Sequence, residues 1–160
     1  MIRLIAAIDR KRGLARHSIL PWSIPEDEQY FTDQTKKYGG NVLTGATTYR
    51  NTYHGPLKDR QNFILTHDKT PIEGVILVHN LNGFLQDFQE DLWVAGGAAV
   101  FDQVIKLDQA DELYLTHIDA DFGCDQFFPE YEERFKLVEQ SEPREQNGFR
   151  FHYARYAKIS

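Results

Sequence analysis

The chain has 160 residues, of which 41% are hydrophobic and 26% charged, so it can bury one core but hardly two. Its 18 Lys and Arg residues against 24 Asp and Glu residues give a formal charge of −6 at pH 7. This balance argues against a nucleic-acid partner or an anionic-membrane binder, since both need excess positive charge. We therefore expect a single domain over residues 1–160.

The single cysteine, Cys124, excludes an internal disulfide framework and a multi-cysteine metal site, and a lone thiol fits a reducing compartment. The apolar run that opens the chain is too short for a signal peptide. No apolar stretch approaches the ~20 residues that span a bilayer. The sequence therefore predicts a cytoplasmic protein with no membrane partner.

Short apolar runs alternate with segments of helical spacing through the first two thirds of the chain. The runs are typical of buried strands and occupy residues 2–8, 42–44, 63–65, 75–78 and 92–95. Helical spacing occupies residues 23–38, 81–88 and 100–105, and the first of these begins with Ser-Ile-Pro-Glu, a capping-box pattern. This alternation predicts an α/β domain with a mainly parallel central sheet.

The last third changes character. Residues 113–118, 135–139 and 149–157 are strand-like, and Asn147-Gly148 is a strong tight-turn signal. We expect the last two segments to form an antiparallel hairpin at the edge, which makes the sheet mixed.

Asp27 is the first candidate for chemistry, because helical spacing places it on one face with Tyr30, Phe31 and Gln34. A carboxylate beside two aromatic rings is a candidate buried acid, and desolvation raises the pKa of such a group above about 3.9. The alternative is that Asp27 only complements the helix dipole from the first turn.

The polar segment 9–24 precedes this helix, and its length is typical of a lid. Within it, Trp22 offers a flat ring with one N–H donor, which suits a cover for a planar ligand. The equally good alternative is that Trp22 anchors the loop on the core.

Two glycine turns follow core strands. Gly96-Gly97 opens a helical segment, where backbone N–H groups and the helix dipole can hold a phosphate. Gly45, with Thr47 and Thr48 after it, repeats the arrangement. Two such turns at the carboxyl ends of strands indicate a dinucleotide lying across the sheet.

Two further side chains are ambiguous on the residues alone. Arg60 either binds a ligand carboxylate or is a solvated surface charge. Thr116 places a hydroxyl in an apolar strand, where a backbone carbonyl is its simplest partner. His67, His79 and His117 lack the close spacing of a zinc site, so we expect no metal.

Taken together and in this order, the residues resemble the dihydrofolate reductase family over essentially the whole chain. The most diagnostic segment is Leu20-Pro21-Trp22, followed by Pro25-x-Asp27 and then Phe31. The other matching segments are residues 2–8, Gly45-x-x-Thr48, Arg60-Gln61-Asn62, Val94-Ala95-Gly96-Gly97, residues 113–118 and Asp125-x-x-x-Pro129. The resemblance implies that family's single-domain α/β fold, with a mixed, mainly parallel sheet flanked by helices.

The resemblance also implies an activity: hydride transfer from C4 of the NADPH nicotinamide to C6 of 7,8-dihydrofolate, with protonation of N5, in a monomer that supports one-carbon metabolism. Two alternatives stay open. One is the pyrimidine reductase of riboflavin synthesis, which has the same fold. The other is a nucleotide-binding module without catalysis.

The implied roles fall into three sets. The catalytic set is Asp27, Thr116 and Trp22. The substrate-binding set is Ile5, Asp27, Phe31, Leu57, Arg60 and Thr116. The cofactor-binding set is Ala7, Gly13, Leu14, Ala15, Ser18, Ile19, Gly45, Ala46, Thr47, Thr48, Thr66, His67, His79, Gly96, Gly97, Ala98, Ala99, Val100 and Phe101.

The chain departs from the family pattern at several of these positions. Ala46 and Ala99 stand where basic residues are common, which weakens the case for a strict preference for NADPH over NADH. Ala15 replaces a common glycine, Glu28 occupies a position that is more often apolar, and Phe101 lacks a hydroxyl often found there.

Overall fold

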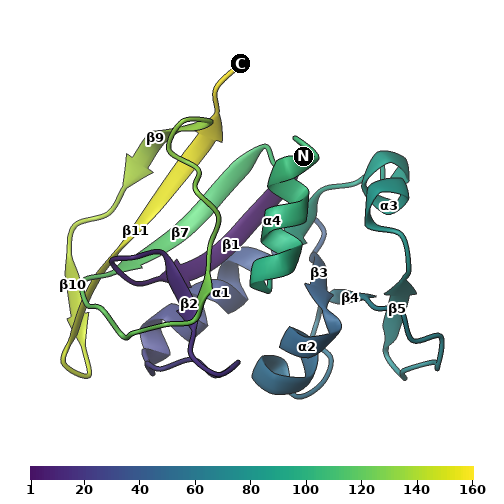
Figure 1. The fold of residues 1–160 in the computed structure, drawn as a ribbon, viewed down its shortest axis with the longest axis horizontal. Helices are drawn as coiled ribbons and strands as arrows, with labels where there is room; N and C mark the ends of the chain where they lie inside the picture. The colour runs from purple at the N-terminus through teal and green to yellow at the C-terminus, as the bar shows by residue number, and fades with distance from the viewer.

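The computed structural model describes residues 1–160, which are built around one nine-stranded sheet (Figure 1). The strands pair in the order β10-β11-β7-β1-β6-β3-β4-β5, and β9 also pairs with β11. The bounds of these strands are β1 (Ile2–Ile8), β3 (Asn41–Gly45), β4 (Gln61–Leu65), β5 (Val75–Val78), β6 (Leu92–Val94), β7 (Glu112–Ile118), β9 (Phe135–Gln140), β10 (Arg144–Gln146) and β11 (Phe149–Lys158). A separate antiparallel pair joins β2 (Gly13–Ala15) to β8 (Gln126–Phe127).

The helices are short. They are α1 (Pro25–Thr35), α2 (Ala46–Thr48), which continues into a π-helical segment over Tyr49–Tyr53, α3 (Leu81–Asp87) and α4 (Ala98–Lys106). None of them has the length and apolar character needed to cross a bilayer.

The central parallel strands are buried on both faces, and successive side chains along each of them point to opposite sides of the sheet. In β1, Leu4 and Ile8 join the large core cluster with Val104 and other residues of α4. Ile5 points the other way and joins the cluster that Phe31 of α1 packs against. All five continuous apolar runs form strands, as predicted, but residues 75–78 form the edge strand β5, in which Ile76 is 46% exposed.

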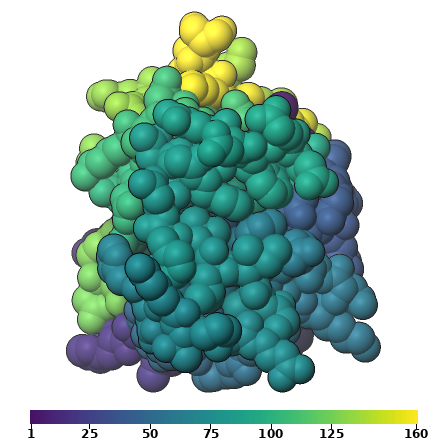
Figure 2. All heavy atoms as spheres, turned by 90° about the vertical axis from the view of Figure 1, so that its right-hand side faces the viewer, coloured from purple at the N-terminus to yellow at the C-terminus, as the bar shows by residue number.

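The pairing pattern confirms the mixed sheet. β1 runs parallel to β6 and β7, and β3 runs parallel to β6 and β4, whereas β11 is antiparallel to β7. At the other edge, α3 and β5 cover the side of the molecule shown in Figure 2.

The C-terminal hairpin needs one correction. Strand β9 pairs with β11 as predicted, but the Asn147-Gly148 turn connects β11 to β10, an additional strand. The two strands share one edge of β11 and are separated near Pro143, which has no N–H to donate to a strand ladder.

The predicted cap of α1 is also wrong. Ile24, not Ser23, occupies the N-cap position, and no side chain caps the helix. Pro25 is the first helical residue, where its missing N–H costs nothing. The first turn carries three acidic residues, Glu26, Asp27 and Glu28. Their negative charges interact favourably with the positive end of the helix dipole.

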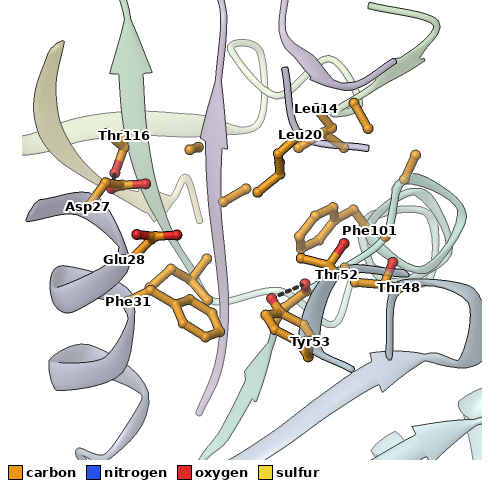
Figure 3. A pocket seen from close by; sticks show the side chains of 18 of the residues that line it. Leu14, Leu20, Asp27, Glu28, Phe31, Thr48, Thr52, Tyr53, Phe101 and Thr116 are labelled. Carbon is orange, nitrogen blue, oxygen red and sulfur yellow. Dashed lines mark hydrogen bonds between the residues drawn. The ribbon is translucent and has the colours of Figure 1, made fainter. Parts of the chain in front are cut away.

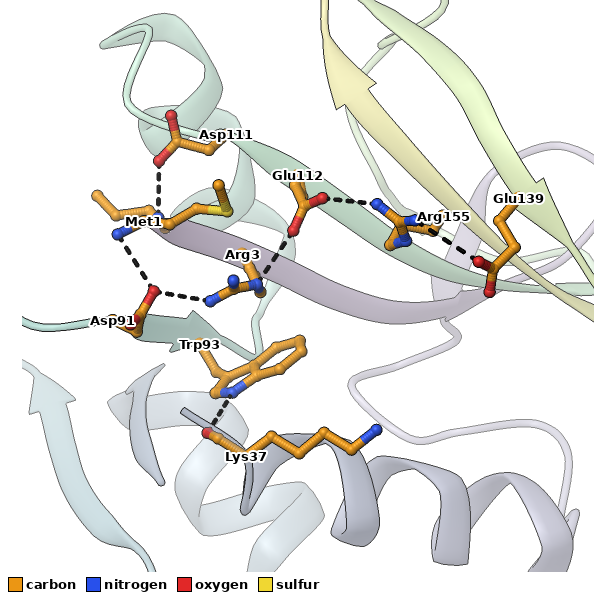
Figure 4. Close-up of polar contacts among 10 residues, drawn as sticks. Met1, Arg3, Lys37, Asp91, Trp93, Asp111, Glu112, Glu139 and Arg155 are labelled. Atoms are coloured by element: carbon orange, nitrogen blue, oxygen red, sulfur yellow. Dashed lines mark hydrogen bonds and ion pairs between the residues drawn. The ribbon is translucent and has the colours of Figure 1, made fainter. Parts of the chain in front are cut away.

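Ion pairs connect neighbouring strands at the amino-terminal ends of the parallel strands (Figure 4). The Arg3 guanidinium, in a residue only 7% exposed, lies 2.9 Å from an Asp91 oxygen and 3.1 Å from a Glu112 oxygen. Glu112 also pairs with Arg155 at 2.8 Å, and the terminal amine pairs with Asp91 at 3.3 Å. These contacts therefore lie at the opposite end of the parallel strands from their carboxyl ends.

Candidate active site

A cleft of about 380 Å³ opens at the carboxyl ends of the central strands (Figure 3). Its wall is made by β1, the segment between β1 and α1, the first turns of α1, the α2 region, and the Gly96-Gly97 turn before α4. Strands that end at the same edge therefore bring together residues far apart in the sequence.

Asp27 and Thr116 meet in this cleft. The Thr116 hydroxyl donates a hydrogen bond of 2.6 Å to Oδ1 of Asp27, and Thr116 is only 2% exposed. The backbone-carbonyl alternative for Thr116 is therefore wrong. Burial raises the pKa of Asp27 to about 6, the Thr116 hydrogen bond opposes this rise, and the nearby charges of Glu28 and Glu26 add to it.

Apolar residues continue the wall beside Asp27. Ile5, Phe31 and Leu57 all line the cleft. The Phe31 ring stacks on Tyr53 with centroids 5.5 Å apart, and the Tyr53 hydroxyl donates to the Ala95 carbonyl oxygen at 3.2 Å. Tyr53 was missed in the sequence analysis, because an irregular π-helical segment with no periodic signal positions it.

Trp22 anchors the loop on the core, and it also faces the cleft. It is 8% exposed and belongs to a small core cluster with Ile24, Ile118 and Phe151. It also lines the cleft. The residue anchors the end of the lid and presents part of its ring to the cavity.

The lid itself is more ordered than the sequence suggests. Strand β2 lies within it and pairs with β8, and the Asp125 N–H donates to the Ala15 carbonyl oxygen at 3.0 Å. At its base, the buried Asp9 carboxylate accepts backbone N–H groups from Lys11, Gly13 and Phe122 at 2.9, 2.7 and 3.1 Å. These contacts fix the base of the lid to the segment that leads to β8.

The two glycine turns lie against each other. The Gly45 N–H donates to the Gly96 carbonyl oxygen at 2.8 Å. A Cβ on Gly97 would lie 2.6 Å from Oγ1 of Thr48, so a side chain there is sterically excluded. Because α4 begins at Ala98, the unpaired N–H groups of its first turn lie beside this glycine backbone. The arrangement fits a phosphate or diphosphate group.

Ten of the nineteen predicted cofactor residues line the cleft. Those that line the cleft are Ala7, Leu14, Ala15, Ser18, Thr47, Thr48, Gly96, Gly97, Ala98 and Phe101. The predicted residues outside the lining are Gly13, Ile19, Gly45, Ala46, Thr66, His67, His79, Ala99 and Val100. Val100 is buried in the core, and Ile19 is 65% exposed.

Ala46, Thr66 and His79 each follow the last residue of a neighbouring parallel strand, so all three lie at the carboxyl end of the sheet. In the register, Gly45 pairs with Leu65 and Leu65 pairs with Val78, so the residues that follow these three share one end of the sheet. The His79 ring contacts the Thr66 carbonyl oxygen through Nδ1 at 2.8 Å.

Arg60 lies outside the cleft lining, at the C-terminal end of α1. Its guanidinium donates to the Thr35 hydroxyl at 2.9 Å and to the Lys58 carbonyl oxygen at 3.0 Å. Besides Tyr53, the wall contains residues that were not among the predicted site residues, namely Ala6, Leu20, Ile24, Glu28, Tyr30, Thr32, Thr52, Ala95 and Gln126. The structure contains no group of three His, Cys, Asp or Glu residues that could hold a metal ion.

A mixed α/β sheet, a phosphate cradle and a buried acid in one cleft define a class of protein: an α/β enzyme that binds a nucleotide beside a reacting ligand. The chain belongs to the dihydrofolate reductase family, because the sequence model of that family, described as "Dihydrofolate reductase", matches residues 1–158.

Individual relatives agree with this assignment. The chain is 31% identical to a dihydrofolate reductase of Aedes albopictus, over 98% of this chain and 96% of the relative. It is 32% identical to that of Bacillus subtilis, over 99% and 95%. The solved structure of dihydrofolate reductase from Enterococcus faecalis, complexed with NADP(H) and RAB-propyl, superposes with a TM-score of 0.86 at 26% identity, over 100% of this chain and 97% of that one.

Proposed function

We propose that this chain catalyses the NADPH-dependent reduction of 7,8-dihydrofolate to 5,6,7,8-tetrahydrofolate and so supports one-carbon metabolism. Family membership supports the reaction, and the NADP(H) complex of the E. faecalis relative supports the cofactor. The observation that carries the proposal is the Asp27–Thr116 pair, which lies in the same cleft as the Gly96-Gly97 cradle. Bound NADPH supplies a hydride to C6 of the pterin.

Asp27 binds the amidine-like edge of the pterin and stabilises the cation that forms when N5 gains a proton from water. Its raised pKa reflects a desolvated carboxylate, and a desolvated carboxylate favours an adjacent cation strongly. Thr116 holds Asp27 in place through its hydrogen bond. Trp22 covers the lid side of the cleft and limits the access of bulk water.

The remaining substrate contacts follow the cleft away from Asp27. Ile5, Phe31 and Leu57 pack on the pterin and aryl groups. Arg60 binds the glutamyl carboxylate where the tail leaves the cleft along α1; its place beside Thr35, at the end of that helix, supports this role.

The cofactor lies along the other half of the cleft. The first turn of α4, together with Thr47 and Thr48, holds its phosphates. The lid residues and Phe101 contact the nicotinamide half. Thr66, His67 and His79 bind the adenosine end, which is supported by their place at the strand edge beside Ala46.

We further propose that the chain acts in the cytoplasm as a monomeric single domain. One sheet that runs through the whole chain and one free cysteine support this assignment. The family match favours this activity over the riboflavin-pathway alternative.

A steady-state assay tests the proposal. Purified protein with NADPH should oxidise the cofactor only when 7,8-dihydrofolate is present, with tetrahydrofolate formed in equal amount. Omission of dihydrofolate is the control. Oxidation that depends instead on an aminopyrimidine ribosyl phosphate would identify the alternative reductase, and cofactor binding without turnover would identify a binding module.

A further inference from the structure

The charges of the cleft are all negative. Among its 26 lining residues, Asp27 and Glu28 are the charged ones, and none is Lys, Arg or His. Uncharged polar groups and apolar side chains make up the rest of the wall. A ligand inside the cleft therefore meets two adjacent carboxylates and no protein cation.

Glu28 differs from its two acidic neighbours because its carboxylate has no partner at all. The Glu26 carboxylate is paired with the Arg144 guanidinium and accepts the Tyr153 hydroxyl. Asp27 accepts the Thr116 hydroxyl. Glu28 is exposed, its carboxylate has no hydrogen bond or ion pair, and Figure 3 shows it turned into the cleft between Asp27 and Phe31.

The cation proposed to bind the substrate tail lies well along α1. Arg60 contacts Thr35, seven residues and about two helical turns from Glu28. The two groups therefore act on different parts of an extended ligand: Glu28 on the portion beside Phe31, and Arg60 on the end that leaves the cleft.

We propose that Glu28 is a specificity-determining residue that makes the aryl end of the cleft prefer positively charged ligands over negatively charged ones. The inference rests on the proposed function, which fixes the heterocycle at Asp27 and the aryl group at Phe31. Because Glu28 is solvated, the effect is modest, about 2–5-fold in affinity per unit of ligand charge, and salt weakens it.

The test uses three 2,4-diaminopyrimidines that share one aryl group and carry on it a carboxylate, a neutral carboxamide or an aminomethyl group. Their dissociation constants are measured by calorimetry at pH 8, at low and at high salt. The wild-type protein should bind the aminomethyl compound most tightly and the carboxylate least tightly. We call the ratio between the largest and the smallest of these dissociation constants the spread. In Glu28→Gln the spread should shrink about 2–5-fold per unit of ligand charge.

Asp33→Asn is the matched control. Asp33 is an exposed carboxylate of the same helix that accepts a hydrogen bond from Gln29 and lies outside the cleft lining. Its removal should leave the spread unchanged. An equal spread in wild type and Glu28→Gln would overturn the inference, as would an equal response in both variants. Failure of all three compounds to bind would instead refute the proposed function.

Discussion

Asp27 shows how burial changes the acid–base chemistry of an ordinary side chain. Its pKa is raised to about 6, chiefly because the cleft desolvates the charged form. The pattern of Asp27, Tyr30 and Phe31 on one helix face predicted a buried acid, and this pKa shift agrees with it. The sequence could not give the Thr116 partner from local signals, since the pair joins residues 89 positions apart.

The first prediction concerns the activity of Asp27→Asn. The amide can still bind the pterin edge but cannot stabilise the cationic form, so turnover at pH 7 should fall about 10²–10⁴-fold. The loss should be smaller at pH 5, where solvent supplies more protons. Profiles of kcat against pH for both proteins measure this, and an equal loss at every pH would contradict the role of Asp27.

The same substitution should stabilise the ligand-free protein. The folded-state pKa of Asp27 lies above the unfolded value, so the carboxyl favours folding when protonated and loses that contribution as pH rises from about 4 through about 6. Asp27→Asn should therefore raise the free energy of unfolding at pH 8 by up to about 3 kcal/mol. Urea denaturation at pH 8 and pH 4 compares the two proteins, and the gain should vanish at the lower pH.

At the scale of elements, the central strands were predictable and the small ones were not. Buried parallel strands leave continuous apolar runs such as residues 2–8 and 63–65, which can be recognised without knowledge of their partners. By contrast, β2 and β8 have three and two residues, and their pairing spans more than 100 positions. An apolar pattern of two or three residues cannot be distinguished from the sequence of a loop.

The lid depends on the Asp9 carboxylate. Asp9→Ala should leave three backbone N–H groups without this acceptor and lower the free energy of unfolding by about 2–4 kcal/mol. Hydrogen exchange should accelerate in residues 9–24. Asp9→Asn keeps one oxygen acceptor and should lose less. Unchanged exchange in both variants would show that other contacts hold the lid.

The strand edge that carries Ala46 gives a prediction for cofactor preference. A guanidinium at position 46 would stand next to Thr66, because Gly45 and Leu65 are in register. Ala46→Arg should therefore raise the ratio of kcat/KM for NADPH to that for NADH, by about 10-fold if one charge-assisted hydrogen bond forms with the ribose phosphate. Ala46→Gln controls for size, and an unchanged ratio in the arginine variant would show that the phosphate lies elsewhere.

At the scale of the whole molecule, the two ends of the parallel strands differ in the contacts that they make. Ion pairs tie the amino ends of the strands together, whereas the carboxyl ends carry the cleft (Figures 3 and 4). The α/β class, the mixed sheet and the glycine turns were predictable from residue patterns. The Arg3 network was not, because its members are scattered along the chain and resemble surface charges.

Arg3→Ala should lower the free energy of unfolding by about 3 kcal/mol, since it leaves two carboxylates short of a cation that is nearly buried. The expected cost is at the lower end of the range for buried pairs, because Glu112 keeps Arg155 and Asp91 keeps the terminal amine. Lys106→Ala, which removes an exposed pair with Asp102, should cost less than about 1 kcal/mol. Thermal unfolding measures both, and kcat/KM should not change in either.

The pairing of β2 with β8 limits how the cleft can exchange its contents. Asp9 fixes one end of the lid and Trp22 is buried at the other. The short stretch from Arg16 to Leu20 between them is held by an Arg16–Ile19 bridge, by the His17 N–H on Asp125 and by the Gln126 amide on Ser18. A flap of that size moves within nanoseconds to microseconds. Opening of the cleft at this stretch therefore has to break only these polar contacts, and it leaves the β2–β8 pair and the main sheet intact.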